Sequence, residues 1–589
     1  MSSVKRKIIQ LSANLARRGL RGLRQVCSQT WRNQREKRRY RKWVRLCDTL
    51  SDADRKLIRA QIEKLQTKPL ISVLMPVHNV EERFLRLAIE SVRKQLYENW
   101  EFCIADDCST KPYIRQVLEE FAAKDSRIKI VFRDENGHIS AASNSALEIA
   151  TGEFAALLDH DDELGEDALF CVAKEINDFP ETWMIYSDED LIDEKGRRYE
   201  PKFKPDWSRD LFYSLNLITH LSVYKTTVLR QISGFRVGAE GSQDYDLAMR
   251  VVERISENHI RHIPKILYHW RVIRGSVAYS PDEKPYAHER ARDALRSHFE
   301  RIGKKVKVSQ TINNLHRVGY ELPEDLPKVS LIFAADEDFG FTEKSLKYFV
   351  GQTDYGNFEI VLLVGTARAD ERLNLPNLKV VVCESASEAE RFNFAAAQTD
   401  GGILCFADLN LKPLSADWLK ELAGFAFQKE IGAVGAKLLY ADETVLHGGL
   451  IIGANGAVGI AHYGFLREST GNLMRAQLIN NFSAVSVSCL MTRREVFESV
   501  GGFNAENLPD RFYDADFCLR LRREKGCRIV FTPYAELMKI DKKRRLNLER
   551  NSTAEEKDYF LKRWREVVER DPFYNSNLSK KNANFSIEI

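Results

Sequence analysis

Residues Phe154–Leu164 read FAALLDHDDEL, an apolar run that ends in a cluster of acids. A short apolar run that stops abruptly is typical of a strand buried on both faces of a sheet. The carboxylates then lie just past the strand's carboxyl end, where open α/β sheets bind their ligands. Acids this close repel one another unless a cation lies among them, and Mg²⁺ or Mn²⁺ binds carboxylates together with substrate phosphates. Taken alone, the acids also fit a solvated turn that caps the next helix.

The chain has 589 residues, too many for one hydrophobic core, and this length predicts two to four domains. A hydrophobic content of 44% is ordinary for a soluble globular protein. The sequence has no run of 18 apolar residues and no signal-peptide pattern, so we expect no membrane-spanning helix. The ten cysteines form no CxxC pair, which favours reduced thiols in the cytoplasm over a zinc site or a disulfide framework.

The first 45 residues contain 15 Lys or Arg and a single acid. Within them Ile8, Leu11, Leu15, Leu20 and Leu23 recur at roughly helical spacing. A basic amphipathic helix suits an anionic membrane surface, which is the partner we expect for residues 1–45. Nucleic acid is a rival partner that we do not expect, and a solvated face or a contact to another subunit is the plainer alternative.

From Pro69 onward, apolar runs alternate with helical patterns, which predicts a parallel sheet with right-handed crossovers. The expected strands are Ile71–Met75, a run ending at Asp106, IKIVF ending near Arg133, and Phe154–Leu158. The expected helices lie at about Phe84–Gln95, Tyr113–Lys124 and Ala146–Ala150, the last preceded by a loop, ENGHISAASN. Three strands end in polar residues on the same edge, and together they indicate one site.

These motifs in this order (PVHN, IADD, NGHISAASN and LLDHDD) resemble the nucleotide-sugar-dependent family-2 glycosyltransferases with the GT-A fold. The closest resemblance is to those of bacterial O-antigen and surface-polysaccharide assembly, and it covers about Ser51 to the C-terminus. It implies an α/β fold of two tandem GT-A domains, Rossmann-like, behind a basic helical N-terminal segment. The implied activity is inverting transfer of a sugar from a nucleotide-diphospho-sugar to a hydroxyl of a lipid-linked glycan, with Mn²⁺ or Mg²⁺. The implied location is the cytoplasmic face of a bacterial inner membrane.

The resemblance also implies roles for individual residues. The implied donor-binding residues are Pro76, Val77, His78, Asn79, Glu81, Asp106, Asp107, Asn136, Gly137, Ser143, Asn144, His160 and Arg271. A carboxylate at Asp106 can accept the imide N–H of uracil or thymine, which favours UDP or dTDP. Asp159 and Asp161 are the implied metal ligands, and Asp162 and Glu163 remain open between that role and a helix cap.

Asp244 matches the family's catalytic base, which takes the proton of the acceptor hydroxyl, while Asp246 is expected to cap the following helix. The sequence departs from the family pattern at Ile273, where many relatives have a His metal ligand. His269 or Arg274 could take over part of that role. A further acidic run at 185–193, IYSDEDLID, either lines the acceptor side or forms a turn, and we favour the turn.

The segment from about Pro327 repeats the first domain. Ser72 precedes Glu101 by 29 residues, as Ser330 precedes Glu359, and a repeat of more than 200 residues is a duplicated domain. The predicted organisation is therefore a basic helical segment at 1–68, a catalytic domain at 69–315, a linker at 316–327, and a second domain with a C-terminal helix at 328–589.

The second copy lacks most of the acids of the first. It has Val364, Gly365, Asn410 and Leu411 where the first has Asp106, Asp107, Asp161 and Asp162. We expect it to be degenerate and to serve acceptor binding, positioning or assembly, and a second, metal-independent transferase is the alternative because Asp514 and Asp516 persist. Two other classes are a glycan-binding scaffold and a sugar-nucleotide pyrophosphorylase. The latter needs a Gly-rich basic loop, which PVHNVEE does not offer.

Overall fold

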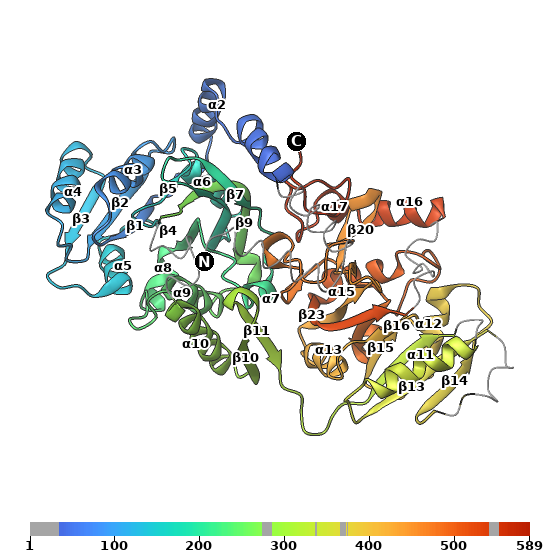
Figure 1. The fold of residues 1–589 in the computed structure, drawn as a ribbon. Helices are drawn as coiled ribbons and strands as arrows, with labels where there is room; N and C mark the ends of the chain where they lie inside the picture. The colour runs from blue at the N-terminus through green and yellow to red at the C-terminus, as the bar shows by residue number, and fades with distance from the viewer. Residues whose placement is uncertain (1–33, 274–284, 336–338, 366–372, 374, 541–552) are drawn as a thin grey trace.

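The computed structural model describes residues 34–273, 285–335, 339–365, 373, 375–540 and 553–589. The amphipathic pattern from Ile8 to Leu23 lies outside the described residues, and so does Arg274. The described chain begins with a helix over 34–47 and α2 (Asp52–Glu63), followed by two sheets that run from blue to green and from yellow to red in Figure 1. Within the described residues, no helix combines the length and the apolar character needed to cross a membrane.

The first sheet has the strand order β3-β2-β1-β4-β8-β6-β9-β5, with β7 added beside β6. Strands β1 (Ile71–Val77), β2 (Trp100–Asp106), β3 (Ile128–Phe132) and β4 (Phe154–Leu157) are parallel. The other strands are β5 (Glu163–Leu164), β6 (Met184–Ile192), β7 (Arg198–Lys202), β8 (Ser222–Lys225) and β9 (Ile260–Arg271). The sheet changes direction at β8, which is antiparallel to β4.

Helices cover both faces of this sheet. Side chains of α3 (Glu82–Arg93), α4 (Pro112–Lys124) and α6 (Ala168–Asp178) pack in one core cluster. On the other face lie α5 (His138–Glu148), α8 (Thr226–Gln231), α9 (Gln243–Val252) and α10 (Pro285–Arg301). Because both faces are covered, the central parallel strands are mostly apolar, and every residue of β2 is buried.

Two local predictions at the edge of the sheet need correction. The first strand was expected to end at Met75, but β1 continues through Pro76 to Val77. Proline is tolerated there because the ladder to β4 ends at Leu74, so no hydrogen bond is lost. The expected loop ENGHISAASN is mostly helix, since α5 begins at His138, with Gly137 as its N-cap residue.

A third correction concerns IYSDEDLID, for which we favoured a turn. All of it but Asp193 lies in β6, a central strand in which all nine residues are buried, including three consecutive acids. The strand pairs with β9 and β8 and has no solvated side. Its acids are tolerated because each meets a cation or another hydrogen-bond donor.

The second sheet adds β18 (Val445–His447) beside β17 and β21 (Asn480–Asn481) beside β23, and otherwise repeats the main strand order of the first as β14-β13-β12-β15-β22-β17-β23-β16. These strands are β12 (Val329–Ala334), β13 (Phe358–Val364), β14 (Leu378–Val382), β15 (Ile403–Ala407), β16 (Leu411–Pro413), β17 (Ile431–Leu439), β22 (Cys489–Arg493) and β23 (Arg528–Lys539). The two tandem α/β copies behind a helical N-terminal segment are confirmed. The single C-terminal helix that we expected is two short ones, α16 (Ala554–Arg563) and α17 (Arg565–Glu569).

Particular contacts repeat as well. Ser72 donates to Glu101 at 2.6 Å, and Ser330 donates to Glu359 at 2.5 Å. The backbone N–H of Phe235 donates to Asn144 Oδ1 at 2.7 Å, and that of Phe503 donates to the equivalent Asn393 at 2.8 Å. These two contacts therefore hold the fold in both copies.

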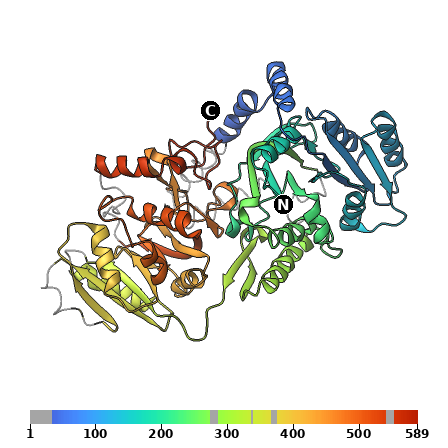
Figure 2. The ribbon, with the colours of Figure 1, turned by 180° about the vertical axis from the view of Figure 1, so that it is seen from behind.

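The two copies are joined through a buried polar interface. Asn481 of the second copy donates to Asp210 of the first at 2.7 Å, and Arg528 forms an ion pair with Asp210 at 2.9 Å. Leu478 of the second copy is fully buried in a core cluster of the first. The C-terminal residues pack beside the helix over 34–47, in a cluster that includes Tyr40 and Phe585 (Figures 1 and 2).

Candidate active site

A cleft of about 2500 Å³ lies at the carboxyl ends of β1 and β4. Its walls come from the first domain, from the helix over 34–47, and from two parts of the second domain, residues 470–474 and the C-terminal residues Leu578, Phe585 and Ile587. Most of the predicted site residues line it: Pro76, Val77, His78, Asn79, Glu81, Asp107, Asn136, Ser143, Asp159, His160, Asp161 and Asp244. The described residues that line the cleft do not include Asp106, Gly137, Asn144 or Arg271.

The loop after β1 is held by its own polar side chains. Asn79 adopts a left-handed backbone conformation, with φ of 49°, and its Oδ1 accepts a hydrogen bond from the Thr110 N–H at 2.9 Å. His78 Nδ1 lies 2.9 Å from the Asp107 carbonyl, and His160 Nδ1 lies 3.2 Å from the Pro76 carbonyl. These contacts hold the loop in place at the carboxyl end of β1.

Asp106 and Asp107, at the end of β2, have different environments. Asp107 accepts hydrogen bonds from Arg133 Nε and from the Gly137 N–H, each at 2.9 Å, so it holds the Asn136–Gly137 loop against the sheet. Asp106 is buried, and its Oδ1 has no hydrogen-bond partner among the described residues. A buried carboxylate oxygen in this state needs a donor from water or a ligand. Contact of Asp106 with a base stays a prediction.

The possible metal ligands that meet at the acidic loop after β4 differ from the predicted pair, Asp159 and Asp161. Asp159, Asp162 and His220 each offer a ligand atom, and these atoms lie within 4.8 Å of one another. Burial, together with Asp161 and Asp159, holds the pKa of Asp162 well above its usual range, and burial likewise raises the pKa of Asp161. Clustered carboxylate oxygens with one imidazole nitrogen fit a divalent cation such as Mn²⁺.

Asp162 and Glu163 do not cap a helix, because α6 begins at Ala168 with Asp167 as its N-cap residue. Asp162 instead accepts hydrogen bonds from the Tyr268 hydroxyl at 2.6 Å and from the Arg271 N–H at 2.7 Å. Glu163 lies in β5 and forms an ion pair with Arg271. Both acids therefore fasten the loop to β9.

Arg271 is fully buried behind the acidic loop. Its Nε donates to the Asp161 carbonyl at 2.7 Å and its Nη1 donates to the Asp193 carbonyl at 3.2 Å. The guanidinium also lies over the Phe84 ring, 4.8 Å from its centroid. The structure thus places Arg271 as a support for the acidic loop after β4, whereas the resemblance implied that it faces a diphosphate.

Asp244 lies in the first turn of α9, which begins at Gln243 with Ser242 as its N-cap residue. The expectation that Asp246 caps this helix is wrong, because Asp246 is buried in an ion pair with Arg250 at 2.7 Å. Asn216 Nδ2 donates to Asp244 Oδ2 at 2.8 Å. Burial and the nearby Asp159 raise the pKa of Asp244 to about 6. A carboxylate with a pKa near the working pH suits a general base.

Sequence reasoning missed Asn216 and His220. Neither residue belongs to a motif with fixed spacing, and each meets its partners only through the fold. A signal for the acids of β6 was present, because the basic run RRYEPKFK at 197–204 follows closely enough to pair with them.

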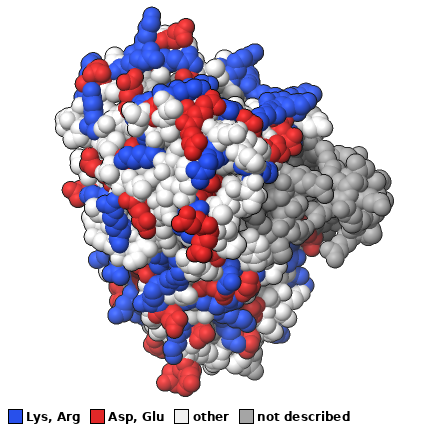
Figure 3. All heavy atoms as spheres, turned by 90° about the vertical axis from the view of Figure 1, so that its left-hand side faces the viewer, with Lys and Arg blue, Asp and Glu red and all other residues white. Residues whose placement is uncertain are grey.

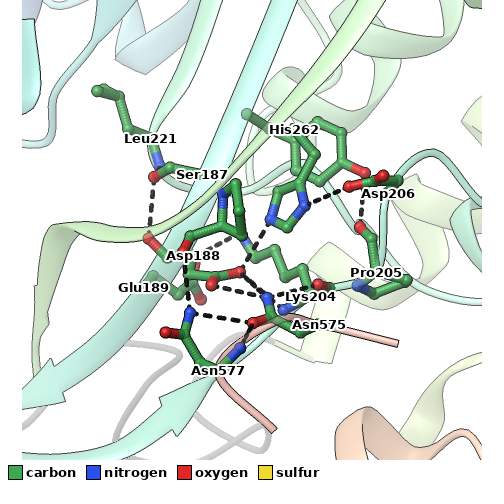
Figure 4. Close-up of polar contacts among 12 residues, drawn as sticks. Ser187, Asp188, Glu189, Lys204, Pro205, Asp206, Leu221, His262, Asn575 and Asn577 are labelled. Atoms are coloured by element: carbon green, nitrogen blue, oxygen red, sulfur yellow. Dashed lines mark hydrogen bonds and ion pairs between the residues drawn. The ribbon is translucent and has the colours of Figure 1, made fainter. Parts of the chain in front are cut away.

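Asp188 and Glu189 of β6 belong to a buried polar network (Figure 4). Asp188 accepts hydrogen bonds from Asn575 Nδ2 at 2.8 Å and from the Lys204 N–H at 2.8 Å. His262 Nε2 lies 2.9 Å from the Asp188 carboxylate. Burial opposes ionisation of Glu189, but its pKa is lowered to about 2 by two lysines, Lys202 and Lys204.

Lys204 connects this network to the cleft. Its ammonium donates to Glu189 at 3.1 Å, to the Thr219 carbonyl, and to the His220 carbonyl at 2.8 Å. Lys204 therefore holds the backbone of His220, and Asn575 of the C-terminal segment holds Lys204 by donating to its carbonyl at 2.8 Å.

The corresponding loop of the second copy has lost these features. Asn410 and Leu411 are buried in place of Asp161 and Asp162. Asp514, which matches Asp244, accepts hydrogen bonds from the backbone N–H groups of Val487 and Ala515 at 3.1 and 2.8 Å. The Asp514 carboxylate thus holds the backbone at Val487 and at the start of its own helix.

Comparison with known proteins agrees with the geometry. The family model "Glycosyl transferase family 2" matches residues 72–233. The "Putative colanic acid biosynthesis glycosyl transferase WcaA" of Escherichia coli is 31% identical over 201 residues, which are 33% of this chain and 70% of that protein. The chain belongs to glycosyl transferase family 2, and its first domain is a glycosyltransferase domain of that family.

Two longer relatives match both copies. The "O-antigen biosynthesis protein RfbC" of Myxococcus xanthus is 32% identical over 88% of this chain, and the "Uncharacterized protein y4gI" of Sinorhizobium fredii is 40% identical over 89%. The matched region is 41% of the first protein and 59% of the second, so this chain spans about half the length of each.

Proposed function

We propose that this protein transfers a sugar, with inversion, from a nucleotide-diphospho-sugar to a hydroxyl of a bacterial surface glycan. The observation that carries the proposal is the presence, in one cleft, of Asp244 with a pKa of about 6 and of the acidic group around Asp159. A base and a cation-binding group are the two components that a single displacement at a sugar phosphate requires.

Asp244 would take the proton of the acceptor hydroxyl as the new glycosidic bond forms. Asn216 holds the carboxylate through a hydrogen bond to Oδ2. Asp159, Asp162 and His220 would hold Mn²⁺ or Mg²⁺, with Asp161 as a further ligand, and the ion would neutralise charge on the departing diphosphate. Arg271 and Tyr268 keep this loop in position from behind.

The donor would lie at the β1–β2 end of the cleft. His78, Asn79, Glu81, Asn136 and Ser143 line this end and offer donors and acceptors to a ribose and a diphosphate. We favour UDP or dTDP, because the carboxylate of Asp106 can accept an imide N–H.

The printed names of RfbC and WcaA support an acceptor that belongs to a surface polysaccharide. A lipid-linked acceptor and peripheral binding to the inner membrane are further proposals. The helix over 34–47 supports them, since it buries Tyr40 and Trp43 and exposes Arg38, Lys42 and Arg45 outside the cleft. By contrast, the face that carries β3 and α4 has acidic and basic side chains interspersed (Figure 3).

The test is a screen of the purified chain with Mn²⁺ against a panel of nucleotide sugars, with mass-spectrometric detection of the released nucleoside diphosphate. We expect hydrolysis of at least one UDP- or dTDP-sugar, and its loss in EDTA and in Asp159→Ala. The matched control is Asp408→Ala in the second copy, which should hydrolyse the same donor. Hydrolysis that survives Asp159→Ala but not Asp408→Ala would assign the working copy the other way round.

A further inference from the structure

The cleft is larger than a nucleotide sugar requires. Its volume is about 2500 Å³, whereas pockets for small ligands and cofactors are typically about 300–1,000 Å³. The proposed donor residues account for the end near β1 and β2. The rest of the cleft has room for a second substrate.

The wall beside Asp244 leads away from the donor end and toward the second domain. Asn216 donates to Asp244, and the ring of Tyr245 stacks on that of His316 with centroids 6.0 Å apart. Farther along, Asn313 Nδ2 lies 3.5 Å from Met474 Sδ of the second domain. An acceptor hydroxyl has to reach Asp244, so the acceptor must lie along this wall.

Three polar atoms on this wall are buried and have no hydrogen-bond partner among the described residues. They are Asn216 Oδ1, His316 Nδ1 and Asn472 Oδ1, and all three residues line the cleft. Buried polar atoms are almost always paired with protein, water or a ligand. Because all three residues line one cleft, they indicate a ligand there that offers several hydrogen bonds.

The ligand that fits is neutral. Burial and the nearby Arg292 lower the pKa of His316 to about 3, so its ring is uncharged and has one donor and one acceptor nitrogen. Amide oxygens accept but cannot pair with a phosphate. Hydroxyl groups, which both donate and accept, satisfy all three atoms.

The second-domain part of the wall is rigidly held. Arg475 donates to the Phe573 carbonyl at 2.8 Å and to Asn480 Oδ1 at 3.1 Å, and Leu478 lies in the first domain's core. A wall that is already ordered loses little entropy when a ligand binds.

We propose that the second domain takes part in acceptor binding, through a subsite for neutral sugar units formed by residues 470–474 with Asn216 and His316. The subsite rests on the proposed function of the first domain, because it is the acceptor side of that site. The degenerate copy thereby gains a task that needs neither a metal nor a nucleotide.

The test is saturation-transfer NMR on the full chain with UDP and Mn²⁺. The probes are di- and trisaccharides of glucose, galactose, mannose, rhamnose and N-acetylglucosamine. We expect at least one to bind, with a Kd raised about fivefold in Asn472→Ala by loss of one hydrogen bond. Leu473→Trp, at a half-buried position of the cleft, should remove binding by filling the subsite. Asn357→Ala is the matched control, because Asn357 is exposed in the same domain and lies outside the cleft.

Thermal unfolding of each variant establishes that it is folded. Failure of every probe to bind the wild type, or equal binding by wild type, Asn472→Ala and Leu473→Trp, overturns the subsite. Donor hydrolysis by the wild type is measured in parallel. Donor hydrolysis without saccharide binding would overturn the subsite and leave the proposed function standing. Saccharide binding that depends on Asn472, without hydrolysis of any donor, would overturn the proposed function and leave the saccharide site standing.

Discussion

At the scale of single residues, Asp244 and Asp514 form a matched pair. Both occupy the first turn of equivalent helices, but Asp244 lines the cleft and Asp514 binds backbone N–H groups. General-base catalysis typically contributes about 10²–10⁴-fold to a rate. We expect Asp244→Asn to lower sugar transfer by about that factor and Asp514→Asn to leave it near the wild-type rate, measured with the donor found in the screen. Near-normal transfer by a folded Asp244→Asn variant would exclude Asp244 as the base.

The raised pKa of Asp244 has a consequence for stability. Its pKa is about 6 in the folded state against an ordinary value of 3.8, so folding favours the protonated form. Its contribution to stability is therefore present below about pH 4, is lost between pH 4 and 6, and stays lost above pH 6. The cost of ionisation is about 2–3 kcal/mol.

We expect Asp244→Asn to raise the unfolding midpoint at pH 7.5 and to have little effect at pH 4, as followed by calorimetry. The transfer rate should move the opposite way, rising with pH through about 6 as the base loses its proton. A pH-independent difference in stability between the two proteins would contradict the assigned pKa.

At the scale of elements, β6 depends on the cations around it. Lys204 is almost fully buried with Glu189, whereas Lys202 reaches the same carboxylate from a position that is 32% exposed. Removal of one partner from a buried pair typically costs about 3–5 kcal/mol, and an exposed partner contributes about 1 kcal/mol or less. We expect Lys204→Met to destabilise the protein by the larger amount and Lys202→Met by the smaller, measured by urea unfolding.

The Lys204 variant also tests whether the β6 network affects cation binding, separately from its effect on protein stability. Lys204 holds the His220 carbonyl, so Lys204→Met should weaken Mn²⁺ binding, seen as a larger free Mn²⁺ signal in electron paramagnetic resonance. Equal Mn²⁺ affinity in wild type and Lys204→Met would show that the network has no influence on the cation-binding group.

The elements differ in how far the sequence could predict them. Apolar runs identified β1, β2 and β4, because a central parallel strand is buried on both faces and has little polar content, and they also identified the half-buried edge strand β3. The strand β6 carries three acids, and one of the hydrogen-bond donors to them is Asn575, 387 residues along the chain from Asp188. No local pattern contains that information. The start of α5 was missed for a similar reason, since Gly137 is held by Asp107 from a neighbouring strand.

The residues of the candidate site also differ in whether the sequence could predict them. Asp159, Asp161 and Asp244 could be named because a motif matched them, and the cleft contains all three. Asn216, His220 and Asp162 could not be assigned their places, because the structure groups them only through contacts between distant segments. The location of Arg271 behind the loop likewise depends on how β9 and β5 pair.

At the scale of the whole molecule, the two copies form one structural unit. A chain that ends at residue 327 loses Leu478, Asn481 and Arg528 from the surface around Asp210, and this surface is buried in the full protein. Exposed apolar surface next to an unpaired buried acid favours aggregation. We expect residues 34–327 alone to be largely insoluble, and co-expression with 328–589 to recover soluble protein, as assayed by size-exclusion chromatography. A monomeric 34–327 that unfolds cooperatively would show that the first domain is independent.

The contact of Asn575 with Asp188 and with the Lys204 carbonyl also sets an order of events during synthesis. A ribosome adds about 5–20 residues per second, so roughly 20–75 seconds separate the emergence of β6 from that of its last hydrogen-bond partner. During that interval the Asp188 carboxylate lacks its hydrogen bond from Asn575. The amino-terminal half therefore cannot reach its final form while the rest is being translated, and it must stay protected, by its own solvation or by a chaperone, until the last part of the chain arrives.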